Sequence, residues 1–204
     1  MADKFYLSLW LKEYSEGQML QRLGTLLETF PYSQQRPKAR SLRVYPLSFN
    51  EHPVLEEDFP DGVETPQLLA LAAEFLHGDC ACEVGAFWDL WVFRKNGGPA
   101  AWKREPQAVS LFCYGPDFEE GAADRGHLEV DFGLDTPFRF GQRAPGAEAR
   151  SLAGDYHLRL QENVTQLLDL IRALEKRLPV AKRWLWTETG GNFAEALKQS
   201  FGQE

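Results

Sequence analysis

Apolar and polar residues alternate along several short segments of the chain, a pattern typical of strands with one buried face. The clearest segment is residues 5–11, in which every odd position is apolar. Residues 41–49 alternate as well, and Pro46 within them favours a strand near a sheet edge. Further strands are expected at Glu83–Arg94, Ala101–Arg104, Ala108–Tyr114, His127–Phe132 and Arg183–Glu188.

Other segments carry apolar residues three or four positions apart, the spacing of an amphipathic helix. Helices are expected at residues 15–30, 65–76, 154–178 and 193–201. In the longest of them, Gly154–Leu178, we expect one apolar stripe to face the core. That stripe consists of Leu160, Val164, Leu167, Leu168, Ile171, Leu174 and Leu178.

The order of these elements, β-α-β-α-ββββ-α-β-α, predicts an α+β fold. We expect a predominantly antiparallel, mixed sheet with the helices packed over it. A chain of 204 residues can bury about 70% of its unfolded surface, enough for one substantial core. We therefore expect residues 1–204 to form a single domain.

Location follows from what the sequence lacks. Residues 1–4 run directly into the first strand pattern, without the basic and apolar regions of a secretion signal. The most apolar stretch, residues 84–93, contains Asp89 and is too short to cross a bilayer as a helix. The three cysteines are an odd number and few for a chain of this length, and Cys80 and Cys82 lie only two residues apart, where a disulfide would be strained. These features predict a cytoplasmic protein with reduced thiols and no membrane partner.

Negative charge is concentrated in two segments that are predicted to be loops. Residues 50–66 contain six acidic residues, residues 115–124 contain four, and neither segment has a Lys or Arg. Because the whole chain has a net charge of −8, the remainder is slightly basic. Nucleic acid is an unfavourable partner for such a surface, whereas a basic protein is a favourable one.

The expected partner-binding residues are the acidic side chains of both segments with one phenylalanine in each as an apolar anchor. They are Glu56, Glu57, Asp58, Phe59, Asp117, Phe118, Glu119 and Glu120. The alternative is that both segments are solvated loops that keep the protein soluble.

Enzyme motifs are missing from the sequence. It contains no Gly-x-Ser-x-Gly elbow, no phosphate-binding loop and no Gly-x-Gly-x-x-Gly turn. One strand does offer candidate chemistry, because a period of two projects His127, Glu129 and Asp131 from a single face. Such a face could supply a general acid and base or bind a hard metal, and it is also the ordinary appearance of a strand with one solvated side.

A second cluster brings His77, Cys80 and Cys82 within six residues. These are ligands that zinc accepts, but a fourth ligand and the usual zinc spacing are missing. We therefore expect His77 at a helix end, the cysteines in the sheet, and no bound metal or cofactor.

The six tryptophans allow two interpretations. Trp88 and Trp91 make both faces of one strand bulky, which is typical of a central strand in a core. Alternatively, Trp10, Trp102, Trp184 and Trp186 line an open aromatic groove.

Taken together, these patterns favour binding over catalysis. We expect a non-catalytic protein that binds a basic partner through its acidic loops, a mode of action found among immunity and inhibitor proteins. The alternative is a small hydrolase or metal-dependent enzyme that uses His127, Glu129 and Asp131.

Overall fold

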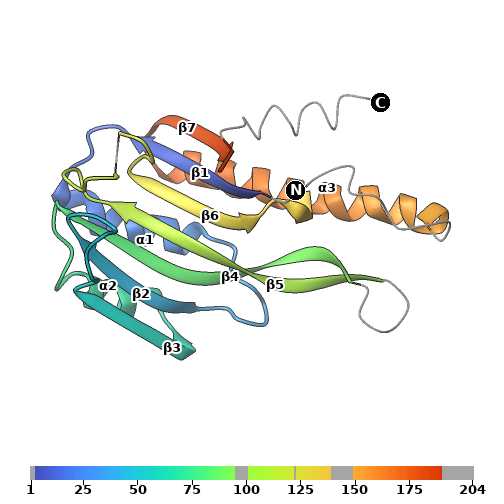
Figure 1. The fold of residues 1–204 in the computed structure, drawn as a ribbon, viewed down its shortest axis with the longest axis horizontal. Helices are drawn as coiled ribbons and strands as arrows, with labels where there is room; N and C mark the ends of the chain where they lie inside the picture. The colour runs from blue at the N-terminus through green and yellow to red at the C-terminus, as the bar shows by residue number, and fades with distance from the viewer. Residues whose placement is uncertain (1–2, 95–100, 122, 139–148, 190–204) are drawn as a thin grey trace.

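The alternating segments pair into one seven-stranded sheet in the computed structural model of the chain (Figure 1). The structure describes residues 3–94, 101–121, 123–138 and 149–189, without the side chains of residues 149–154. The strands are β1 (Lys4–Leu11), β2 (Ala39–Pro46), β3 (Leu55–Val63), β4 (Cys80–Arg94), β5 (Ala101–Tyr114), β6 (Leu128–Leu134) and β7 (Val180–Thr187). Their order is β3-β2-β4-β5-β6-β1-β7, and each neighbouring pair is antiparallel. The predicted α+β class is confirmed.

The order of elements along the chain differs from the predicted one in two places. The acidic segment expected to be a loop contains β3. β3 forms despite its polar sequence because it lies at the sheet edge, where only β2 pairs with it and no continuous apolar face is needed. β5 joins the two strands predicted at 101–104 and 108–114. Pro106 is tolerated there because β6 pairs only with Ser110–Cys113 of this strand.

The described elements therefore run β-α-β-β-α-β-β-β-α-β. The turn predicted at residues 190–192 and the helix predicted at 193–201 lie outside the described residues.

Three α-helices cover one face of the sheet: α1 (Met19–Thr29), α2 (Thr65–Ala72) and α3 (Ala149–Arg177). Short 3₁₀ turns precede α1 at Glu16–Gln18 and follow β6 at Thr136–Phe138. Within the described ranges, no helix combines the length and the apolar character that crossing a membrane requires.

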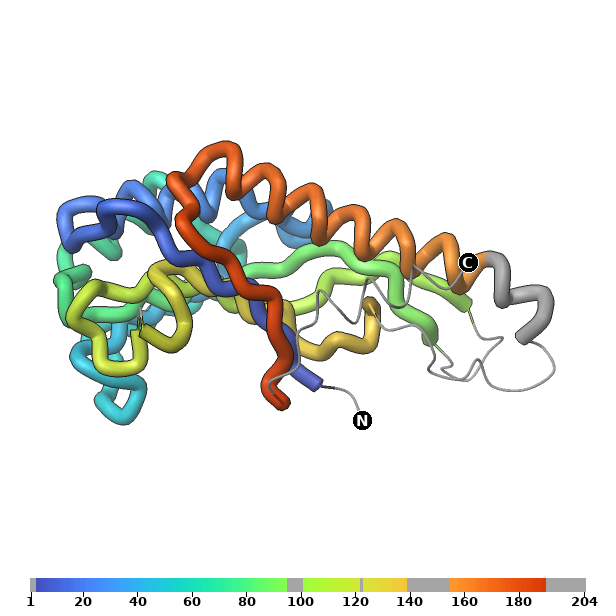
Figure 2. Tube along the Cα trace, turned by 90° about the horizontal axis from the view of Figure 1, so that it is seen from above, coloured from blue at the N-terminus to red at the C-terminus, as the bar shows by residue number. Residues whose placement is uncertain are grey.

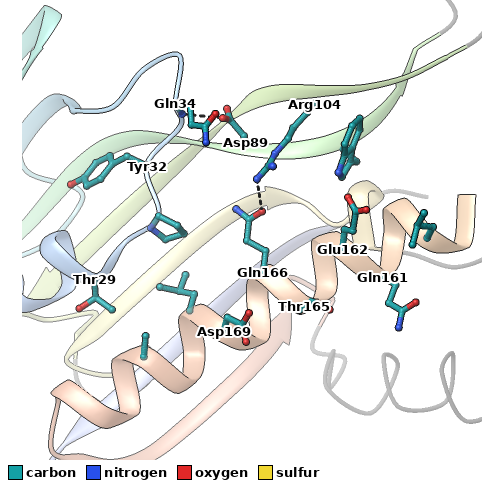
Figure 3. Close-up of a pocket in the computed structure, with 15 residues that line it drawn as sticks. Thr29, Tyr32, Gln34, Asp89, Arg104, Gln161, Glu162, Thr165, Gln166 and Asp169 are labelled. Carbon is teal, nitrogen blue, oxygen red and sulfur yellow. Dashed lines mark hydrogen bonds between the residues drawn. The ribbon is translucent and has the colours of Figure 1, made fainter. Parts of the chain in front are cut away.

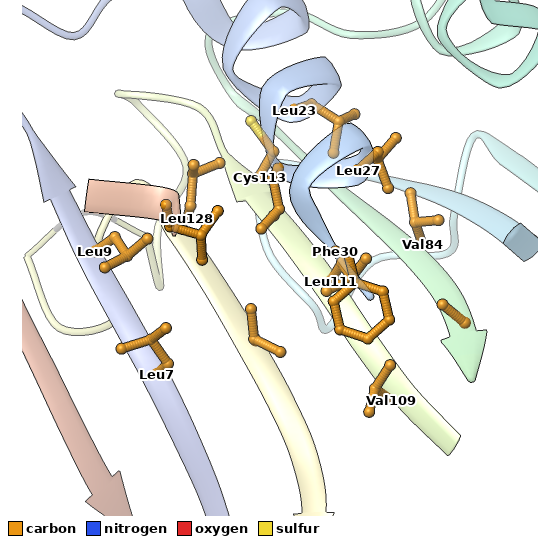
Figure 4. Packing of buried hydrophobic residues seen from close by; sticks show 14 of the residues in the cluster. Leu7, Leu9, Leu23, Leu27, Phe30, Val84, Val109, Leu111, Cys113 and Leu128 are labelled. Atoms are coloured by element: carbon orange, nitrogen blue, oxygen red, sulfur yellow. The ribbon is translucent and has the colours of Figure 1, made fainter. Parts of the chain in front are cut away.

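The core lies between the helices and the sheet (Figure 4). Leu7 and Leu9 of β1 and Leu111 of β5 belong to the same buried cluster as Leu23 and Leu27 of α1. None of these five side chains is more than 1% exposed. The odd positions of residues 5–11 therefore face the helices, as their alternation predicts.

Most of the stripe predicted from Leu160 to Leu178 is buried, along α3 and at the residue that follows it. Leu168 is the exception, since it is 39% exposed while Leu170 is buried instead. The stripe is centred near Leu167 and Leu174, and residue 168 lies about 100° around the helix from Leu167. α3 is about 44 Å long and runs past the sheet alongside the β4–β5 hairpin (Figure 2).

Candidate functional site

The face of the sheet opposite the helices carries polar and aromatic side chains. They come from alternate positions of neighbouring strands, because the helix-facing positions are apolar. The members used below are Lys4, Tyr6, Ser8, Trp10, Arg43, Tyr45, Glu83, Ser110, Phe112, Glu129, Asp131, Trp184 and Trp186. We call this surface the open face.

A shallow groove of about 450 Å³ crosses the middle of the open face. Small residues, including Gly85, Ala108 and Ser110, line it along β4 and β5. Charged side chains also line it, and they are Lys4, Arg40, Arg43, Asp58, Glu83 and Asp131. The groove therefore has room between charges of both signs.

β3 places part of the first acidic segment beside this groove. Arg43 of β2 binds Glu56 at 2.9 Å and Asp58 at 3.4 Å, so that two carboxylates share one guanidinium. Glu57 is exposed on the same strand, and Phe59 is half-buried against the main core. This edge of the sheet keeps a net negative charge.

The second acidic segment folds over one end of the open face. The backbone N–H of Glu119 donates to the Leu47 carbonyl at 2.9 Å, and that of Phe49 donates to Glu120 Oε2 at 3.2 Å. Phe118 is only 4% exposed and its ring lies 5.1 Å from that of Phe49. Asp117 and Glu119 are exposed. The two acidic segments thus approach each other through residues 47–49. Of the two phenylalanines expected as anchors, Phe118 is buried and Phe59 is half-buried.

Glu129 is fully buried where the second acidic segment meets the open face. Its Oε1 accepts hydrogen bonds from Tyr114 at 3.0 Å and from Arg125 at 3.3 Å. Its Oε2 accepts from Ser8 at 3.2 Å, and Ser8 in turn accepts from Trp186 Nε1 at 2.9 Å. Burial raises the pKa of the Glu129 carboxyl above its ordinary value, although Arg125 and the two hydroxyl donors oppose this shift. The network ties the end of the acidic loop to β1 and β7.

His127 and Asp131 make separate contacts from those of Glu129. His127 Nδ1 accepts the Leu11 N–H at 2.9 Å, and its ring stacks on Tyr14 at 4.2 Å. Burial lowers the pKa of His127. Asp131 accepts from Lys4 at 3.3 Å and from the Gly133 N–H at 2.7 Å. The structure places Glu129 and Asp131 on β6 and His127 just before its first residue, and the three side chains make separate contacts rather than one shared site.

The His77, Cys80 and Cys82 cluster is separated by the fold. His77 has a 67% exposed side chain and faces Glu16 at 3.7 Å, whereas both cysteines are buried. Cys82 lies opposite Cys113 in the core, where burial raises the pKa of the Cys113 thiol to about 12. In the part of the chain that the structure describes, no three His, Cys, Asp or Glu side chains are placed to hold a metal ion.

The tryptophans divide between the core and the open face. Trp88 is fully buried, and Trp102 packs with Phe93 and Tyr156 along the hairpin. On β1 and β7 the Tyr6 and Trp186 rings stack at 4.4 Å, and Trp184 stacks on Trp186 at 5.3 Å. We call Tyr6, Trp184 and Trp186 the aromatic ladder. The sequence suggested an aromatic surface, but only strand pairing brings residues 6 and 186 together.

Comparison with known proteins finds no family model, no curated protein and no solved structure that matches this chain.

Proposed function

We propose that the protein is a non-catalytic binding protein that takes a basic protein partner on the open face of its sheet. The observation that supports this most directly is the composition of that face. It has acidic side chains along one border, a groove with charges of both signs in the middle, and aromatic rings along the other border. Interfaces commonly combine aromatic anchors with a charged rim.

The acidic border favours a basic partner. The side chains of Glu56 and Asp58 are 57% and 73% exposed, and Arg43 balances only one of their two charges. The exposed Asp117 and Glu119 add to the same sign. Because exposed charges act mainly on the rate of encounter, we expect them to steer a basic partner towards the face.

The aromatic ladder takes over the anchoring role first assigned to Phe59 and Phe118. Trp184 is 37% exposed, so its ring can be covered by a partner. Tryptophan contributes a large apolar area when it is buried at an interface. Stacking on Trp186 holds the ring in place before binding, which reduces the entropy lost on association.

A cytoplasmic location is part of this proposal. Cys80, Cys82 and Cys113 are all free and buried, which suits a reducing compartment. A hydrolase based on His127, Glu129 and Asp131 has less support, because each of these side chains is already held by neighbouring residues.

The test passes an extract of the producing cells over three immobilised forms of the protein and identifies the proteins that each form retains. The first is the natural chain. The second neutralises five residues of the two acidic segments: Glu56→Gln, Glu57→Gln, Asp58→Asn, Glu119→Gln and Glu120→Gln. The third removes the same charge from exposed positions elsewhere: Glu13→Gln, Glu28→Gln, Glu74→Gln, Asp155→Asn and Glu175→Gln.

A basic protein should be retained by the natural chain and by the third form at about 50 mM salt, and retention should weaken at about 300 mM because screening shortens the range of exposed charges. The second form should lose this protein, and Trp184→Ser should weaken its retention at both salt concentrations. If all the forms retain the same proteins, the acidic border is only a solubilising surface and the proposal is wrong.

A further inference from the structure

A larger cleft, of about 900 Å³, lies between α3, the chain that follows α1 and the β4–β5 hairpin (Figure 3). It shares no lining residue with the groove of the open face. Its apolar lining consists of Pro31, Tyr32, Trp91, Leu158, Leu170 and Ala173. The cleft is within the usual size range of small-molecule sites.

Asp89 is the most deeply placed charged group in this cleft. It is only 7% exposed, and its Oδ2 accepts the backbone N–H of Gln34 at 2.9 Å. Its Oδ1 is buried and has no hydrogen-bond partner in the structure. Buried carboxylate oxygens are ordinarily hydrogen-bonded, because an unpaired one loses the hydration it had in the unfolded chain. The unused oxygen therefore favours a ligand that donates a hydrogen bond, and most of all a cationic donor.

Arg104 is the second charged group of the cleft without an ion partner among the described residues. Its guanidinium reaches from β5 to α3 and donates to Gln166 at 3.4 Å, a long bond to a neutral amide. In the strand register Arg104 lies opposite Trp91, two positions from the residue opposite Asp89. Diagonal neighbours of this kind are close enough for long side chains to meet, yet these two form no ion pair.

The other two charged groups that line the cleft are already paired. Glu162 binds Arg159 at 3.1 Å, and Arg159 also stacks on the Trp91 ring at 3.9 Å. Asp169 binds Arg172 at 3.0 Å. Asp89 and Arg104 are therefore the charged lining groups that have no ion partner among the described residues. Apart from Glu162 and Asp169, the other side chains that line the cleft are apolar or uncharged polar ones.

We infer that this cleft binds a small zwitterion with an apolar side chain, an α-amino acid or a short peptide. Its ammonium group would donate to Asp89 Oδ1, and its carboxylate would accept from Arg104. The apolar part would lie against Tyr32, Leu170 and Ala173. A ligand with both charges satisfies both free groups at once, whereas a simple cation would meet Asp89 but would be repelled by Arg104.

The test is calorimetric titration of the full chain with three zwitterions: L-phenylalanine, L-leucine and L-leucyl-L-phenylalanine. We expect at least one to bind with a Kd of about 1 mM or lower, and to shift the backbone amide NMR signals of Gln34 and Gln166. Phenethylamine, which lacks the carboxylate, and 3-phenylpropanoate, which lacks the ammonium group, should each bind about tenfold more weakly than phenylalanine or not at all.

Two variants and one matched control complete the test. Asp89→Asn keeps an acceptor for the Gln34 N–H but loses the charge, and Arg104→Gln replaces an exposed guanidinium whose contact with Gln166 is a long bond to a neutral amide. Each should weaken binding by about tenfold or more, whereas the neighbouring exposed Lys103→Gln should bind like the natural chain. If Asp89→Asn does not fold, Arg104→Gln alone decides. The inference is overturned if none of the three zwitterions binds, if the amine or the acid binds as tightly as phenylalanine, or if Arg104→Gln binds unchanged.

Discussion

The side-chain amide of Asn163 in α3 takes the place of a neighbouring strand for Trp91 in β4. Its Oδ1 accepts the Trp91 N–H and its Nδ2 donates to the Trp91 carbonyl, both at 2.9 Å. Nδ2 also donates to the Pro137 carbonyl at 2.8 Å. These contacts are needed because β2 pairs with β4 only as far as Gly85 and leaves the outer edge of the hairpin without a strand beside it. One side chain thus joins the hairpin, the turn after β6 and the long helix.

We expect Asn163→Ala to lower the free energy of unfolding by about 2–4 kcal/mol, because it leaves three backbone groups, the N–H and carbonyl of Trp91 and the carbonyl of Pro137, without their partner at a buried position. Urea denaturation followed by circular dichroism measures the change. Lys176→Ala, at an exposed position of the same helix, is the control. Equal losses in the two variants would mean that water replaces the amide without cost.

A second prediction concerns the two adjacent leucines of α3. Leu167 is fully buried and Leu168 is 39% exposed. Leu167→Ala should destabilise the protein by about 2–5 kcal/mol by leaving a cavity in the core, and Leu168→Ala should cost less than about 1 kcal/mol. Both are measured by chemical denaturation, and similar losses at the two positions would contradict the helix orientation described above.

A third prediction follows from the raised pKa of Glu129. Because burial favours the protonated carboxyl in the folded state, folding binds a proton at pH values just above the ordinary glutamate pKa of 4.5. The contribution to stability is therefore fully present below about pH 4.5 and is lost as the pH rises through the raised value. Relative to Glu129→Gln, which does not titrate, the natural protein should become less stable as the pH rises above about 4.5 and through the raised pKa of Glu129. Denaturation curves at closely spaced pH values test this, and a constant difference between the two proteins would show that the pKa is not raised.

A fourth prediction concerns His127, whose Nδ1 accepts the Leu11 N–H. This bond needs a neutral ring with its proton on Nε2, and burial lowers the pKa below 6.5. The sign is opposite to that of Glu129: stability is present above about pH 6.5 and is lost as the pH falls through the lowered value. NMR titration of the ring, with the urea-unfolded chain as the reference, should show the lower pKa and the Nε2–H tautomer. A folded-state value at or above the unfolded one would contradict the contact with Leu11.

Local patterns in the sequence determined most of the secondary structure. Alternation in residues 5–11 is sufficient to predict β1 and its buried face, because a strand with one apolar side must turn that side to the core. The helical spacing of leucines between Leu160 and Leu178 predicts α3 for the same kind of reason, although it does not distinguish Leu168 from Leu170. β3 escaped prediction because an edge strand is held by backbone bonds to β2, and its side chains carry no apolar alternation.

Only the tertiary structure decided which polar groups share a surface. The alternation in the sequence predicted His127, Glu129 and Asp131 on one face of a strand. It could not show that Arg125 and Tyr114 donate hydrogen bonds to Glu129. Nor could it show that His127 Nδ1 accepts the Leu11 N–H. Tyr6 and Trp186 meet because β1 pairs with β7. Asp89 and Arg104 line the same cleft because a hairpin brings them together beside α3. The periodicity of a chain fixes which side of an element is buried, whereas contacts between residues distant in sequence depend on strand order and helix placement, which periodicity does not encode.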